Sequence, residues 1–80
     1  MEMVALDVIG MVVDERKRQD DKWGEQNHNP ERWLAILGEE VGEACKAVLE
    51  GDAEGYRKEL VQVAAVAVAA VENLDRAEAK

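Results

Sequence analysis

The sequence has 80 residues, of which 18 are acidic and 10 are basic, so its formal net charge is -8. This charge repels phosphate polymers and anionic lipid headgroups, which excludes polymeric nucleic acid and membrane surfaces as expected partners. The length allows one domain, and a domain this small is marginally stable alone. The single cysteine, Cys45, cannot form an intrachain disulfide. We therefore expect a reducing compartment and stabilisation by a metal ion or by further copies of the chain.

The sequence gives no sign of a targeting or membrane-spanning segment. The apolar start of the chain is interrupted by Asp7, and no basic residue precedes it. The longest apolar stretch, residues 61–71, is much shorter than the roughly 20 residues that a transmembrane helix needs. We therefore expect a cytoplasmic protein.

The spacing of apolar residues predicts three helices, over residues 3 to about 22, 30 to about 50 and 53 to about 75. The polar segment 24–29 joins the first two helices. Residues 77–80 are expected to fray, as chain ends commonly do.

The ends of the second and third helices carry specific signals. Asn29 before Pro30 is typical of a helix start, because Asn caps free backbone N–H groups and Pro is favoured in the first turn. Gly51 suits the end of a helix, and Asp52 suits the N-cap of the next one. A short turn between two antiparallel helices is therefore expected here.

Two apolar patterns predict how the helices pack. The second helix carries a stripe at helical spacing that is typical of a seam with a neighbouring helix; the stripe consists of Leu34, Leu37, Val41, Ala44 and Val48. In the third helix, residues 61–71 are apolar on all sides apart from Gln62. Three helices cannot easily enclose such a segment, so we expect a short all-α bundle of three main helices that is completed by a homo-dimer or homo-tetramer.

Acidic residues gather on the second helix. Glu39, Glu40 and Glu43 lie within an arc of roughly 100°, and the third helix adds Glu59 and Gln62 on one face. Antiparallel pairing would bring Glu59 level with Glu43. Mg²⁺ prefers oxygen ligands of this kind, whereas the alternative is an acidic surface exposed to solvent.

The order of these residues resembles the paired motif of the MazG-like all-α nucleoside triphosphate pyrophosphohydrolases, which include the dCTP pyrophosphatases and are related to the dimeric dUTPases. Glu40-Val41-Gly42-Glu43 matches the family's E-x-x-E, and Glu59-Leu60-Val61-Gln62 is similar to its E-x-x-D. The likeness extends from about Glu15 to Asp75. It implies one MazG-like helical domain over residues 1–80, which hydrolyses a nucleoside triphosphate to the monophosphate and pyrophosphate in a housecleaning role.

The resemblance also implies which residues hold the metal ion. Glu40, Glu43, Glu59 and Gln62 would bind Mg²⁺, with Mn²⁺ as a substitute. Glu39 or Glu43 would act as the catalytic base that accepts the proton of the attacking water. Gln62 stands where the family has Asp, so it offers an oxygen without a negative charge.

Six residues are candidates for substrate binding: Arg18, Lys22, Trp23, His28, Lys58 and Asn73. The basic ones suit phosphate oxygens, and Trp23 suits stacking on a nucleobase. Four of them have a structural alternative: ion pairs along the first helix for Arg18 and Lys22, a helix-end anchor for Trp23 and a loop or capping role for His28. Lys58 and Asn73 are phosphate contacts that the resemblance implies. Trp33 is expected to lie in the core, and Cys45 is expected to pack beside the seam of the second helix.

Two other functions compete with the hydrolase. The amide at Gln62 also fits a non-catalytic relative whose metal site is degraded and which binds a nucleotide or a protein partner. A di-iron bundle needs Glu-x-x-His on paired helices. The only histidine, His28, precedes the second helix, which argues against that function.

Overall fold

The computed structural model describes residues 3–79 and contains three helices, α1 (Met3–Trp23), α2 (Pro30–Leu49) and α3 (Ala53–Glu78). No strand occurs among these residues, so the predicted all-α class with three helices is confirmed. Residues 1, 2 and 80, at the limits of the predicted domain and of the predicted frayed end, lie outside the described residues. Helix α3 continues to Glu78, beyond the end predicted near residue 75. The side chain of Arg76, in its last turn, donates hydrogen bonds to segment 24–29.

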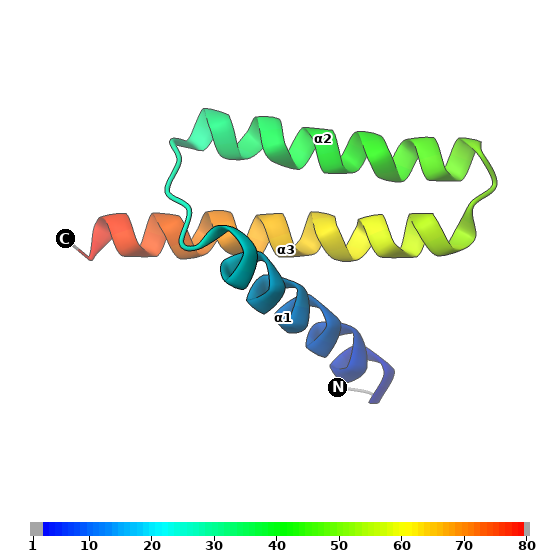
Figure 1. Cartoon of the computed structure of the whole chain (residues 1–80), viewed down its shortest axis with the longest axis horizontal. Helices are drawn as coiled ribbons and strands as arrows, with labels where there is room; N and C mark the ends of the chain where they lie inside the picture. Colours follow the sequence, from blue (N-terminus) through cyan, green and yellow to red (C-terminus); the bar gives the residue numbers. More distant parts are fainter. Residues whose placement is uncertain (1–2, 80) are drawn as a thin grey trace.

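The helices form an antiparallel pair, α2 and α3, and α1 meets α3 at an angle (Figure 1). Helices α2 and α3 run side by side. The C-terminal end of α1 meets α3, and the N-terminal end of α1 points away from the pair. Within residues 3–79, α1 packs on α3 and α2 packs on α3, but α1 and α2 do not pack on each other. Helix α3 is therefore the shared surface of the fold.

The predicted turn and caps are confirmed. Gly51 has a φ of 70°, a conformation that is strained for residues with a Cβ atom. Its N–H donates to the carbonyl of Val48 at 3.1 Å, and the N–H of Asp52 donates to that of Ala47 at 2.9 Å. These two bonds form a Schellman motif. The side chains of Asn29 and Asp52 each accept a backbone N–H at the start of their helices.

The core is small and consists mainly of alanine. The buried apolar residues are Trp33, Ala44, Ala47, Ala65, Val66 and Ala69. No large side chain of the described part is fully buried. The chain therefore relies on close helix contact between small side chains rather than on a thick apolar interior.

The face predicted for packing on α2 was wrong, because the helix is rotated about its axis relative to that prediction. Leu34, Val41 and Val48 are 67 %, 45 % and 56 % exposed, and we refer to them as the outer stripe. The face that meets α3 instead carries Trp33 and Ala47, together with Leu37 and Ala44 of the predicted seam. This face is turned by roughly 70° from the predicted one. Trp33 fixes the rotation through its hydrogen bond to α3, and the alanines allow close approach.

The apolar segment 61–71 is only partly covered within one chain. Ala65, Val66 and Ala69 are buried, but Val68 and Val71 are exposed. The further copy that would cover them remains a prediction. No helix of residues 3–79 has the length and apolar character that crossing a bilayer requires.

Candidate functional site

Carboxyl groups from α2 and α3 meet between the two helices. Glu40 is half-buried, and its carboxyl group lies near enough to that of Glu59 on α3 to share a hydrogen bond when one of the two is protonated. Burial raises the pKa of Glu40, and the bond with Glu59 and the charge of Glu59 raise it further. The negative charges of Glu43 and Glu39 act in the same direction. A carboxyl group surrounded in this way favours a bound proton or a bound cation over a bare negative charge.

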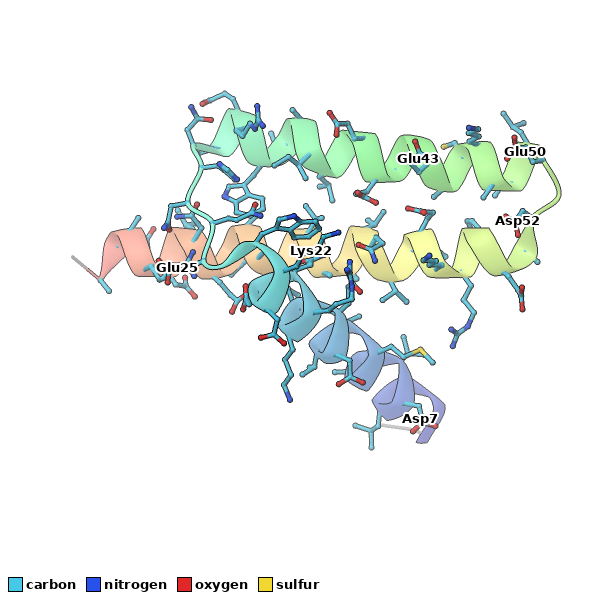
Figure 2. The ribbon with its side chains drawn as sticks, in the orientation of Figure 1. Asp7, Lys22, Glu25, Glu43, Glu50 and Asp52 are labelled. Carbon is cyan, nitrogen blue, oxygen red and sulfur yellow. The ribbon has the colours of Figure 1, made fainter. Side chains whose placement is uncertain are left out.

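The carboxyl that meets Glu59 is that of Glu40, and not that of the level residue Glu43. The rotation of α2 places Glu40 in the helix contact, whereas Glu39 and Glu43 are exposed. Figure 2 shows Glu43 along the middle part of α2. Among residues 3–79, no three or more His, Cys, Asp or Glu side chains are grouped closely enough to hold a metal ion.

The pair formed by Glu40 and Glu59 is compatible with Mg²⁺ in its usual protein setting. This ion is commonly bound through one or two carboxylates, with waters and substrate phosphates completing its coordination. The mutual repulsion of two adjoining carboxylates is the electrostatic feature that a divalent cation would relieve. The residues therefore suit a cation shared with a substrate rather than a closed cage.

A cavity of about 400 Å³ opens beside this pair. Glu40 and Gln62 line it together with two aromatic side chains, Trp23 and Trp33. Arg16, which also lines it, donates to Glu72 at 2.7 Å and to Asp20 at 3.0 Å. The cavity thus combines a carboxyl group, aromatic surface and a guanidinium group that acidic neighbours hold in place.

The end of α1 supplies two of the predicted phosphate ligands. Arg18 and Lys22 both lie over the ring of Trp23, at 5.7 and 4.8 Å from its centroid. The indole is about half exposed, so its surface is divided between these cations and solvent. Figure 2 shows Lys22 where α1 passes in front of α3, far from the turn that Glu50 and Asp52 mark.

Some of the predicted substrate-binding residues line a second cavity, of about 530 Å³, and not the first one. Arg18 and Lys58 line it, together with Arg57. Gln62 is the residue that lines both cavities. The predicted substrate residues are therefore divided between the two sides of Gln62.

His28 and Asn73 belong to the contacts that hold segment 24–29. Oδ1 of Asn73 accepts the backbone N–H of His28 and the indole N–H of Trp33, each at 2.7 Å. The imidazole meets the ring of Trp33 edge-on, with centroids 4.9 Å apart. Nδ2 of Asn73 donates to Oδ1 of Asn27 at 3.2 Å. Both polar atoms of the Asn73 side chain are thus engaged within the chain.

Sequence reasoning missed Arg76, which also lines the first cavity. Its Nη2 donates to the carbonyl of Gln26 at 2.9 Å and to Asn27 at 3.1 Å. Its Nε lies 3.4 Å from Glu25 but makes no hydrogen bond there. The available signal was the spacing of Asn73 and Arg76, which places both on one face of α3.

Comparison with family models, with curated proteins and with solved structures found no match to this chain.

Proposed function

We propose that this protein is a Mg²⁺-dependent nucleoside triphosphate pyrophosphohydrolase, which converts an NTP or dNTP into the monophosphate and pyrophosphate. The observation that supports this proposal most is the meeting of Glu40 and Glu59 beside a cavity that also holds an indole and guanidinium groups. The two glutamates are also the positions that resemble the MazG-like motif. An unrelated acidic surface would not require its carboxyl groups to approach one another between helices.

Each group of residues has a role in this proposal. Glu40 and Glu59 would hold the cation, with Glu43 added from the exposed edge of α2. The bound Mg²⁺ would neutralise phosphate charge and make a water molecule more acidic. Glu39 or Glu43, which solvent reaches, would accept the proton of the attacking water.

The remaining residues would position the substrate. Lys22 and Arg18 would contact phosphate oxygens, since both lie at the end of α1. The exposed part of the Trp23 ring would stack on the base. Positioning of this kind supplies much of the acceleration in phosphoryl transfer.

We further propose that the active form is a homo-dimer or homo-tetramer. The accessible surface of one chain is 5926 Å², whereas a compact monomer of this mass exposes about 4,800 Å². The excess exceeds the roughly 800 Å² that one partner buries in a standard interface. The outer stripe of α2 supplies apolar surface for such an interface.

The decisive experiment measures pyrophosphate release from a panel of canonical and modified nucleotides, with and without Mg²⁺ or Mn²⁺. We expect turnover that needs the cation and that falls by about 100-fold or more in Glu40→Gln and Glu59→Gln. Glu50→Gln, at the far end of α2 (Figure 2), is the matched control and should keep full activity. No release from any nucleotide would overturn the proposal.

A non-catalytic, nucleotide-binding relative is the second candidate. The amide oxygen of Gln62 accepts a hydrogen bond from Gln19 at 3.3 Å, and the described residues offer no group of three metal-binding side chains. Nucleotide binding by calorimetry without any turnover would favour this function over hydrolysis.

A further inference from the structure

The side chain of Gln62 is engaged with α1. Nε2 of Gln19, on α1, donates to Oε1 of Gln62 at 3.3 Å and to Oε2 of Glu15 at 3.2 Å. Oε1 of Gln19 in turn accepts a hydrogen bond from Arg16 at 3.0 Å. The oxygen that Gln62 would offer to a cation is thus held by an amide from the neighbouring helix.

Glu15, which shares the amide of Gln19 with Gln62, carries a negative charge. Two N–H groups of Arg18 donate to the carboxylate of Glu15, at 2.8 and 2.7 Å. These bonds are the main reason that the pKa of Glu15 is lowered to about 2, against the opposing effect of burial. Hydrogen bonds from Gln62 and Gln19 lower this pKa as well. Glu15 is therefore ionised at neutral pH, and it shares the amide donor of Gln19 with Gln62.

We propose that Gln62 is a positioning residue that holds α1 against α3, that it is not a cation ligand, and that the neighbouring carboxylate of Glu15 requires an uncharged side chain at this position. The amide nitrogen of Gln19 donates both to the oxygen of Gln62 and to the carboxylate of Glu15, so the side chains at positions 62 and 15 lie close together around one donor. An Asp at position 62 would add a second negative charge beside Glu15. Only the statement about the cation rests on the proposed function.

This role links residue 62 to the rest of the site. Helix α1 carries Trp23 to the first cavity, and Lys22 lies over the ring of Trp23. Its docking on α3 depends on side-chain bonds such as those of Gln62 and Arg16. The cation is then left to the carboxylates of α2 and α3, while Gln62 sets the position of the groups that meet the substrate.

The test compares Gln62→Asp, Glu15→Gln and the double variant Glu15→Gln/Gln62→Asp with the wild-type chain. Thermal unfolding is followed without divalent cations, and Mg²⁺ affinity is measured by calorimetry. Ala67→Asp adds the same charge at an exposed position of α3 and loses at least as much helix propensity, which makes it a matched control.

We expect Gln62→Asp to lower the unfolding midpoint by about 4–8 °C, more than the control does. The double variant should regain most of this loss, because a neutral amide at position 15 can donate to Asp. Rescue of this kind would not follow from a general loss of packing. If Gln62→Asp does not fold, folding of the double variant supports the proposal and its failure to fold contradicts it.

Two results would overturn the proposal. One is a Gln62→Asp variant as stable as the wild-type chain. The other is Mg²⁺ binding that becomes about tenfold tighter or more in Gln62→Asp whatever residue stands at position 15, because a cation ligand gains from the added charge. A wild-type chain that binds no Mg²⁺ would defeat the proposed function, while the unfolding comparison would still decide the role of Gln62.

Discussion

The indole nitrogen of Trp33 on α2 lies 2.7 Å from Oδ1 of Asn73 on α3, in a buried hydrogen bond between residues 40 positions apart. The same oxygen accepts the backbone N–H of His28. One amide side chain therefore fixes the rotation of α2 and the path of the segment that precedes it. The position of Glu40 opposite Glu59 depends on that rotation.

Replacing Asn73 with Ala should destabilise the fold strongly. The change leaves the donors of Trp33 and His28 without a partner in a mostly buried site, which should cost at least about 2 kcal/mol. Urea unfolding followed by tryptophan fluorescence measures the loss. Asn27→Ala removes only the weaker outer bonds and should cost clearly less; equal losses would contradict this account.

Arg16 should be needed to keep α1 docked. Its guanidinium joins α1 to Glu72 of α3 at 2.7 Å, whereas Arg18 pairs within α1 only, with Glu15. In Arg16→Met, we expect amide hydrogen exchange of α1 to rise by about tenfold, with little change in α2 and α3. Arg18→Met should leave the exchange of α1 close to that of the wild-type chain.

The stability of the cation-free protein should fall as the pH rises past the ordinary range of a carboxyl group. The pKa of Glu40 is raised above its usual 4.5 by burial and by Glu59. The folded state therefore holds this proton more tightly than the unfolded state does. The resulting stabilisation is complete below pH 4.5 and is lost as the pH rises through the raised pKa.

The comparison of the wild-type chain with Glu40→Gln isolates this effect. Unfolding midpoints measured in a chelator at about pH 4 and about pH 8 should show the variant gaining on the wild-type chain at the higher pH, because the amide that replaces the carboxyl group carries no charge. A difference between the two proteins that is the same at both pH values would contradict the prediction.

Replacing either of two exposed glycines with alanine should change the free energy of unfolding, but in opposite directions. Gly51 has a φ of 70°, so Gly51→Ala should cost about 1 kcal/mol. Gly42 lies inside α2 with open space where a Cβ atom would stand, so Gly42→Ala should stabilise the chain by about 0.5–1 kcal/mol. Urea unfolding of the two variants measures both changes.

The outer stripe of α2 should control assembly. Leu34→Lys and Val48→Lys place charge on side chains that are exposed in one chain, so they should not harm the fold of that chain. We expect them to shift the protein toward monomer in sedimentation experiments. Glu50→Lys, which lies off the stripe, should leave the assembly unchanged. A wild-type chain that is monomeric at micromolar concentration would refute the role of the stripe.

The sequence predicted the elements of the fold better than their contacts. Asn29, Gly51 and Asp52 signal helix ends through their own backbone and side-chain preferences, so their roles could be predicted locally. The rotation of α2 about its axis could not be predicted in this way, because the outer stripe and the face that begins at Trp33 both repeat at helical spacing. The bond from Trp33 to Asn73 decides between them, and no short-range pattern predicts it.

In the candidate site, too, local features could be predicted from the sequence, whereas contacts that depend on tertiary packing could not. The pairing of acidic residues across a helical hairpin was predictable from their distance to Gly51. The identity of the partner of Glu59 was not, because it depends on the rotation of α2. The engagement of Gln62 with α1 was also hidden, because Gln19 and Gln62 are far apart in the sequence and α1 reaches α3 only through tertiary packing.

The dependence of both other helices on α3 has a consequence for biosynthesis. Because α1 and α2, over residues 3–79, pack on α3 and not on each other, neither has a docking surface until the residues of α3 have been translated. The nascent chain must keep both segments unassembled until α3 emerges. Collapse of the local hairpin should then precede the arrival of α1, since contacts between neighbouring segments form fastest.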